Sequence, residues 1–319
     1  MSHHHGNNLN FNVAESALKP LFTTNAYRHA LAMAFDWAII ITAVCFCIHF
    51  FNPFTYLLTV IVVGARMHAL AILMHDSTHY RFLKNRKWND LITNLLTMYP
   101  LFTSIETYRE NHLRHHRHLN TEDDPDWVAK LGKPEFTFPK TKAEFIGTVF
   151  SYLTLYQGLR DAAWFLKRFG SEDKKADKKQ KTAGKKSRLL FYFFLVGILT
   201  ITGGWKYFAL YWVVPFLSTF FMFQYIRSVA EHYGELSYDH LLTSTRSVKA
   251  TALERFFIAP HNVGYHLEHH LYPGVPFYNL EKLHDVLMES ADYSDKAHVT
   301  EGYLSGLLNE LGAQRVAAF

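Results

Sequence analysis

The chain has 319 residues, a formal net charge of +5 with histidine counted as neutral, and 49% hydrophobic residues. Its mean hydropathy is nevertheless close to zero, at -0.07, so apolar blocks must alternate with strongly polar ones. The only two cysteines, Cys45 and Cys47, lie in an apolar run. They exclude a disulfide framework, a zinc ribbon and a rubredoxin-like module.

Two apolar stretches near the N-terminus predict a first membrane hairpin. The stretch 29–51 contains one acidic residue, Asp36, near its start. At about 1.5 Å per residue it is long enough to cross a hydrocarbon core of about 30 Å. Asn52 and Pro53 interrupt it, and a second apolar stretch follows over 54–74. Because the link is so short, we expect the two helices to run antiparallel.

A second hairpin is predicted from the aromatic stretch 189–202 and the longer stretch 205–226, which are separated by two glycines. Lys and Arg are concentrated in the segment 80–187 and in the C-terminal tail, whereas the two hairpin turns carry almost none. The positive-inside rule therefore places that segment and both termini in the cytoplasm. The lysine-rich run 167–188 is typical of a solvated loop, with attraction to anionic lipids as the alternative.

These patterns predict an all-α integral membrane protein, with four transmembrane helices in two hairpins and a helical cytosolic cap. We expect residues 1–28 to form a cytosolic or interfacial N-terminal segment. Residues 29–290 would then form the membrane domain, and residues 291–319 a cytosolic tail.

Three groups of histidines have the spacing that brings side chains to one face of a helix. The first has the pattern H-x-x-x-H, and the second and third both have H-x-x-H-H, which places their members at i, i+3 and i+4. One further histidine lies six residues beyond the last span. All of them fall at or beyond the cytosolic ends of the expected helices, which independent core histidines need not do. The nine residues are His75, His79, His112, His115, His116, His232, His266, His269 and His270.

This donor set predicts two metal ions. Eight or nine imidazoles exceed what one tetrahedral zinc ion accepts, and no thiolate accompanies them. Imidazole binds zinc, copper, iron and nickel, so the ligand type alone leaves the metal open. Nearby carboxylates are expected to accept a ring N–H and so to orient a ligand, with bridging of the metals by one of them as the alternative. These carboxylates are Asp76, Glu106, Glu231 and Glu268. For Asp123, Asp124 and Asp126, a plain acidic turn and the same supporting role are both open.

In this order, and with paired apolar hairpins between them, the three histidine boxes resemble those of the membrane fatty acid desaturase and hydroxylase superfamily. The resemblance covers roughly residues 30–290. The stretches 111–127 and 260–280 look like those of bacterial members, which include acyl-lipid desaturases and carotenoid ring hydroxylases. The resemblance implies two iron ions held by the nine histidines above a channel between four helices. There, O2 and two external electrons would desaturate or hydroxylate a lipid.

Two positions depart from patterns found within the superfamily. Ser228 stands where the acyl-CoA branch commonly has an asparagine that reaches a metal through water, and we keep it as a supporting candidate. His266 stands where front-end desaturases with a fused cytochrome b5 have a glutamine. The resemblance therefore favours neither branch.

The substrate channel and the partners are expectations of the same kind. His68 lies seven residues before His75, on nearly the same helical face and about 10 Å deeper. We expect His68 and Arg66 either to line the channel or to pack inside the bundle. The expected partners are a lipid substrate, the bacterial inner membrane with the histidine site on its cytoplasmic face, and an external electron donor such as ferredoxin, drawn by a basic surface. No nucleic acid is expected.

The histidine boxes and the apolar hairpins leave three hypotheses for the function. The first is an O2-dependent desaturase that acts on an acyl chain of a membrane lipid or fatty acid. The second is a hydroxylase or ketolase of a carotenoid or acyl lipid with the same ligands. A transition-metal transporter or sensor is a distant alternative, because it would place ligands midway through the spans, and apart from His49 and His68 these spans lack them.

Overall fold

The computed structural model describes residues 11–163 and 178–312. Residues 164–177, which carry part of the lysine-rich run, lie outside the described residues, as do the two ends of the chain, including the end of the expected tail.

The chain divides into two compact units, and each is described by itself. The span unit comprises Ala26–Tyr108 and Gly147–Ile226. The C-terminal unit comprises Met1–Asn25, Arg109–Ile146 and Arg227–Phe319.

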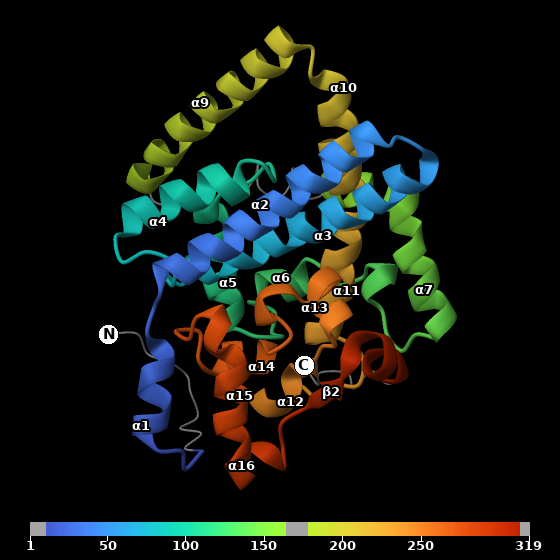
Figure 1. Ribbon diagram of the computed structural model, residues 1–319. Coiled ribbons are helices and arrows are strands. Elements are labelled where there is room, and N and C mark those ends of the chain that lie inside the picture. Colours follow the sequence, from blue (N-terminus) through green and yellow to red (C-terminus); the bar gives the residue numbers. More distant parts are fainter. Residues whose placement is uncertain (1–10, 164–177, 313–319) are drawn as a thin grey trace. The chain divides into compact units, whose positions relative to one another are not determined.

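The first hairpin of the span unit consists of α2 (Ala26–His49) and α3 (Pro53–Thr78), which lie side by side (Figure 1). Asn52 begins α3, because its side-chain oxygen accepts two backbone N–H groups of the first turn while the Thr55 hydroxyl accepts the N–H of Asn52. Pro53 costs no hydrogen bond at this position, since an N–H there has no partner within the helix. The Asn-Pro pair thus ends one apolar helix and begins the next.

A third long apolar helix runs over Trp205–His232. Pro215 lies in the middle of it, lacks an N–H and crowds the carbonyl four residues earlier. Wider turns of π type on both sides of the proline accommodate this break. The segments of this helix are α10 (Trp205–Phe208), η5 (Ala209–Val213), η6 (Phe216–Phe220) and α11 (Phe221–His232). Among the described residues, this helix, α2 and α3 are the three that are long and apolar enough to cross a membrane.

The expected span 189–202 lies within α9 (Lys178–Thr202). This helix ends at Gly203, whose φ of +66° is in the left-handed region that glycine adopts without strain. The chain then turns back into α10 (Figure 1). Apolar side chains of α9 are largely exposed, with Phe193 at 72% and Ile201 at 87%, as on a helix surrounded by lipid. Crossing of the membrane by α9 stays a prediction.

Two contacts hold the interior of the span unit together. A Cβ added at Gly64 would lie 2.0 Å from the Thr219 hydroxyl oxygen, so only glycine lets α3 approach η6 this closely. Between α2 and α3, Arg66 donates from Nη1 to Oδ1 of Asp36 at 3.0 Å, and both side chains are buried. Pairing makes such charges tolerable in an apolar interior. The other elements with residues in this unit are α4 (Arg86–Thr93), η2 (Asn94–Met98), α5 (Ile105–Arg117), α7 (Lys142–Ser151) and η4 (Tyr152–Thr154).

The C-terminal unit is built from short helices and two short strands. The strands β1 (Ser247–Lys249) and β2 (Val299–Glu301) pair in parallel, with Ser247 opposite Val299. The other elements are α1 (Glu15–Leu18), η1 (Lys19–Phe22), α6 (Pro125–Val128), η3 (Pro134–Phe136), α12 (Leu241–Ser244), α13 (Ala252–Phe257), η7 (Pro260–Asn262), α14 (His266–Leu271), η8 (Phe277–Asn279), α15 (Leu280–Met288), α16 (Ala291–Ser294), η9 (Gly302–Gly306) and η10 (Leu307–Asn309).

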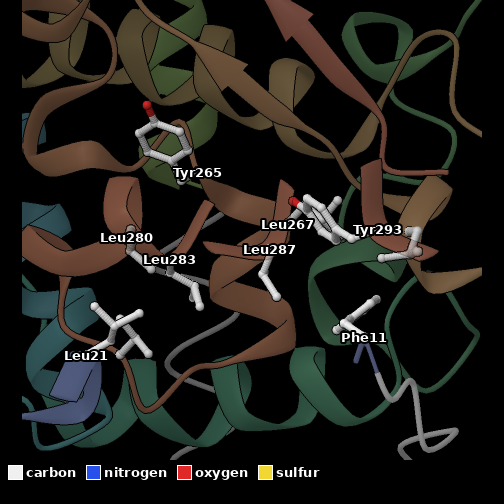
Figure 2. Close-up of a cluster of buried hydrophobic side chains, with 10 residues drawn as sticks. Phe11, Leu21, Tyr265, Leu267, Leu280, Leu283, Leu287 and Tyr293 are labelled. Carbon is white, nitrogen blue, oxygen red and sulfur yellow. The ribbon is translucent and has the colours of Figure 1, made fainter. Parts of the chain in front are cut away.

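A buried hydrophobic cluster forms the core of the C-terminal unit (Figure 2). Leu283 and Leu287 lie one turn apart on the inner face of α15. They pack with Leu267 of α14 and with Phe11 and Leu21 of the N-terminal segment. The core therefore packs against α14, the helix that carries the third histidine box.

Candidate metal centre

The second box lies near the C-terminal end of α5. His112 and His116 are one helical turn apart, and their Nε2 atoms are 2.9 Å from each other. His115 lies at i+3 and, being displaced around the helix by about 100° from His116, reaches a different set of neighbours.

The third box forms most of α14. Leu267 and Glu268 lie on the other faces of this helix and are fully buried, so the three histidines share the remaining face. Just before the helix, a Cβ added at Gly264 would lie 2.5 Å from the Val248 carbonyl oxygen, while the Val248 N–H donates to the Gly264 carbonyl at 2.7 Å. Glycine thus allows β1 to lie against the turn that begins α14.

Side chains of the two boxes meet in two groups within the C-terminal unit. In the first group, the Nε2 atom of His116 lies 2.9 Å from that of His112 and 3.0 Å from that of His269. This group combines the i, i+4 pair of the second box with the i+3 residue of the third.

The second group has the reciprocal composition and includes one further histidine, from α11. It combines the i, i+4 pair His266 and His270 with His115 and with His232. The Nε2 atom of His266 lies 2.9 Å from that of His232 and 3.0 Å from that of His270. One ligand nitrogen from each of the four residues lies within 4.8 Å of those of the others.

These close contacts cannot all be hydrogen bonds. A ring nitrogen carries either one proton or one lone pair, so the Nε2 atom of His116 can serve only one of its two neighbours, and the same holds for His266. Nitrogens about 3.0 Å apart are instead typical of neighbouring ligands at a right angle around a metal about 2.1 Å away. The donors of each group therefore fit a metal ion.

Electrostatics favour the metal-binding form of His266. Burial, followed by the neighbouring imidazoles of His270 and His232, holds the pKa of His266 well below its usual value. Desolvation and like charges both disfavour the protonated ring, so this imidazole is neutral at physiological pH. A neutral ring offers the lone pair that a metal needs.

Asp124 supports one ligand of the second group. One of its oxygens accepts two N–H groups at the start of α6. The other accepts the Nδ1–H of His115 at 2.9 Å and the backbone N–H of Asn120 at 2.9 Å. Because a carboxylate only accepts, His115 holds a proton on Nδ1, so Nε2 is the nitrogen that could bind a metal.

Glu231 lies beside a second ligand of the same group. Its Oε1 atom is 3.4 Å from Nδ1 of His266 and accepts Nε of Arg227 at 2.5 Å. The carboxylate is nearly fully buried, and the guanidinium of Arg227 balances its charge. Glu231 thus lies near a box histidine, and its role in orienting that ring stays a prediction.

The first box belongs to the span unit. His75 lies in the last turn of α3 and His79 at its C-cap. Their ring centroids are 5.8 Å apart, and the ring of His75 also lies 6.3 Å from that of Tyr108. One ligand nitrogen of each histidine lies within 4.8 Å of the other, so the pair can bind one metal together.

Comparison with known proteins identifies the family. The profile of the fatty acid desaturase family matches residues 51–302, which is most of the chain. The chain belongs to the fatty acid desaturase family. It is therefore an enzyme of the membrane desaturase type, an oxidoreductase of lipid metabolism, and its three long apolar helices are those of a membrane protein.

Three relatives illustrate the similarity. The dihydrorhizobitoxine desaturase of Bradyrhizobium elkanii is 30% identical over 84% of this chain and 77% of its own length. The sn-1 oleoyl-lipid 12-desaturase of Anabaena variabilis is 24% identical over 73% and 69%. The sn-1 acyl-lipid omega-3 desaturase (ferredoxin) of Nostoc sp. (strain 36) is 25% identical over 69% and 63%.

Two of the carboxylates that the sequence singles out lie in the span unit of the desaturase. An oxygen of Asp76 is 3.4 Å from Nδ1 of His29. Both oxygens of Glu106 accept the side-chain amide of Asn94, at 3.0 and 3.1 Å. These contacts involve no box histidine, so the supporting roles of both carboxylates stay predictions. Ser228 lies in the C-terminal unit, and its hydroxyl oxygen is buried.

Glu268 holds the third box from the side that faces the core. Its Oε1 atom accepts Nδ1–H of His284 at 2.5 Å and the hydroxyl of Tyr293 at 2.6 Å, and its Oε2 atom accepts the hydroxyl of Ser247. These donors come from α15, α16 and β1. Glu268 therefore fixes α14 to three neighbouring elements rather than reaching a ligand ring through these bonds.

The two channel candidates are buried in the span unit. Arg66 pairs with Asp36, as described above, and the ring of His68 stacks on that of Phe223 at 6.5 Å. These contacts agree with packing inside the bundle. Whether the two side chains also line a substrate channel stays a prediction.

Sequence reasoning left Asp124 open between two roles and did not find the partners of Glu268. A local signal favours Asp124, because an aspartate before proline is a common helix N-cap and lies nine residues after His115. No such signal exists for His284 and Tyr293, which approach Glu268 only through the tertiary fold.

Proposed function

We propose that this desaturase binds two iron ions through nine histidines and uses O2 and external electrons to introduce a double bond into an acyl chain. The main support for the proposal is that Nε2 atoms of histidines converge in two groups, and that neither group contains a thiolate. Removal of hydrogen from an alkyl chain is an oxidation. Zinc has no redox chemistry. Among the metals that imidazole binds, iron therefore fits a desaturase best.

Each histidine group has a share in this site. His112, His116 and His269 would hold one ion, and His115, His232, His266 and His270 the other. His75 and His79 would complete the first set, a role that rests on the family pattern of three boxes. When bound, the metal pair supplies the activation of O2 that the oxidation needs.

The surrounding residues prepare the ligands. Asp124 holds the proton of His115 on Nδ1, and Glu231 lies beside Nδ1 of His266, so both rings present Nε2 to the metal. Overall, the substrate gives up two hydrogen atoms. These combine with O2, two electrons from the donor and two protons to form two molecules of water.

We propose an acyl chain of a membrane lipid or fatty acid as the substrate. Support comes from the family and from the Anabaena and Nostoc relatives, whose names specify acyl lipids. The name of the Nostoc relative also specifies ferredoxin, which supports an iron–sulfur protein as the electron donor. The Bradyrhizobium relative is named for another substrate, dihydrorhizobitoxine, so the products outside the lipid fraction also need to be measured.

The proposed topology places four spans in two hairpins, with α9 as the fourth span beside the three long apolar helices. The histidine site and both termini would face the cytoplasm of a bacterial inner membrane. The support is the distribution of Lys and Arg. Accessibility of cysteines introduced at residue 52 and in the 80–160 segment would test this, since the two are expected to label from opposite sides.

The central experiment combines metal analysis with product profiling. The purified wild-type chain is expected to contain about two iron ions, and a host that expresses it to accumulate a new double bond that the His269→Ala variant does not produce. One zinc ion per chain, or no metal, would contradict the proposal. A new hydroxyl or keto group in a lipid or carotenoid would favour the hydroxylase or ketolase alternative.

A further inference from the structure

An aromatic cluster lies directly beside the second histidine group. The ring of Trp127 stacks on that of Tyr233, with centroids 5.6 Å apart and planes 11° apart. It also meets the ring of Tyr238 edge-on at 5.1 Å. Tyr233 follows His232 in the chain, and the Tyr238 hydroxyl donates to the His232 carbonyl at 3.0 Å. Both tyrosines therefore connect Trp127 to a residue of the second group.

Trp127 is linked to the same group along a second route. It lies in α6, whose N-cap is Asp124, and the carboxylate of Asp124 binds Nδ1 of His115. The indole is 7% exposed. The helix α6 is thus connected to two candidate ligands, to His115 through Asp124 and to His232 through the tyrosines that pack on Trp127.

The segment that follows Trp127 is basic and partly apolar at its surface. Val128 and Leu131 are 47% and 53% exposed. Four lysines lie within the same stretch, while its acidic residue Glu135 is buried at 4% exposure. The ammonium of Lys130 lies over the ring of Phe136, 5.5 Å from its centroid. The lysines are Lys130, Lys133, Lys140 and Lys142.

We propose that residues 127–142 form the docking surface for an acidic iron–sulfur protein that donates one electron at a time, and that the rings of Trp127 and Tyr233 lie on the path along which the electron tunnels toward His232. The proposal rests on the proposed function, which requires two electrons per turnover. In each step the donor is oxidised by one electron and the metal site is reduced by one. The donor must then leave, which suits a small interface with an apolar centre and charged rim.

Charge selects the partner. The positive side chains of this segment, which also exposes Val128 and Leu131, attract an acidic surface and raise the rate of encounter, an effect that salt weakens. Electron tunnelling falls steeply with distance, so aromatic rings between this surface and His232 shorten the gap.

The docking surface is tested with the full detergent-purified chain and an acidic [2Fe–2S] ferredoxin. The variant Lys130→Glu/Lys133→Glu/Lys142→Glu is expected to raise the KM for ferredoxin at least about tenfold at low salt. Its iron content, and its turnover with dithionite and a small mediator, should match wild type. The control Lys19→Glu/Lys282→Glu/Lys296→Glu makes the same change of charge at exposed lysines elsewhere in this unit, and is expected to keep the wild-type KM.

Direct binding separates this inference from the proposed function. Ferredoxin should bind the wild type at least about tenfold more tightly than the 130/133/142 variant in a titration, even if no product forms. Binding without turnover would count against the proposed function alone. An unchanged affinity in this variant would overturn the docking surface. So would weaker attachment to anionic lipid vesicles with an unchanged affinity for ferredoxin, because the segment would then be a membrane contact.

The aromatic route has its own test. Trp127→Leu is expected to lower turnover at saturating ferredoxin at least about tenfold, with unchanged ferredoxin affinity and iron content, and Trp127→Phe to restore much of it. An equal loss with dithionite and mediator in Trp127→Leu would show that Trp127 only supports packing, and would overturn the route.

Discussion

At the scale of single residues, the site depends on which ring nitrogen holds a proton. His115 donates its Nδ1 proton to buried Asp124, and burial keeps His266 neutral, so both rings offer Nε2 to the second group. The charged residues nearby, Glu231 and Arg227, neutralise each other at 2.5 Å. The fold itself therefore holds these two histidines in a form that could bind a metal.

Loss of one imidazole should be visible as loss of metal. His266 lies between two other histidines of the second group, so we expect His266→Ala to lower the iron content from about two per chain to about one or less, and to abolish turnover. His118, two residues after the second box, provides the matched control. His118→Ala should keep both irons, as measured by elemental analysis of the purified protein. Two irons in His266→Ala would refute the assignment of this ligand.

The hydrogen bond from His115 to Asp124 should affect metal affinity more than folding. Asp124→Asn keeps an N-cap for α6 but replaces the charged acceptor, and we expect metal affinity to fall about 10- to 100-fold. Competition with a chelator measures this. Asp123 is exposed and adjacent, so Asp123→Asn should have wild-type affinity. Equal affinities in the two variants would mean that Asp124 only caps the helix.

At the scale of elements, α14 is held more firmly than its six residues would suggest. Glu268 accepts donors from α15, α16 and β1, and Leu267 lies in the core shown in Figure 2. A helix this short is not stable alone. The surrounding elements therefore determine where the third box points.

Gly264 offers a test of this packing. A Cβ there would lie 2.5 Å from the Val248 carbonyl oxygen, so Gly264→Ala should push β1 from α14 and cost about 1–3 kcal/mol of stability. Gly147 in α7 has nothing within 4 Å of an added Cβ, so Gly147→Ala should be neutral or stabilising by up to about 1 kcal/mol. Thermal unfolding in detergent distinguishes them. Similar melting temperatures would contradict the close contact at Gly264.

At the scale of the whole molecule, Asp36 and Arg66 form a buried ion pair between the apolar helices α2 and α3. Asp36→Asn would leave the guanidinium without its compensating charge, which should cost about 3–5 kcal/mol. The double variant Asp36→Leu/Arg66→Met removes both charges and should recover most of that stability. Unfolding in detergent measures both. If Asp36→Asn were as stable as wild type, the pair would not be structural.

The same double variant separates two interpretations of Arg66. If Arg66 only packs inside the bundle, the recovered protein should make the wild-type products. A changed distribution of products, measured on the extracted lipids, would place Arg66 beside the substrate.

The sequence by itself determined the family and the apolar helices that Asn52 and Pro53 separate, and it singled out nine histidines whose role as ligands stays a prediction. The family follows from the resemblance of the three histidine boxes, the shared face of each box from the periodicity of one helix, and the apolar helices from hydropathy, all of which are local in the sequence. It left the role of Asp124 open, and it did not reveal His284 and Tyr293 as partners of Glu268, because those contacts join residues distant in sequence or depend on how a turn closes.

Only the tertiary structure decided how the histidines of the second and third boxes are shared. Each of these boxes sends its i, i+4 pair to one group and its i+3 residue to the other. The pattern H-x-x-H-H is the same in both boxes and fixes only the face of the helix. Which nitrogens meet depends on how α5, α11 and α14 pack, so His266, His269 and His270 belong to two groups although they share one turn.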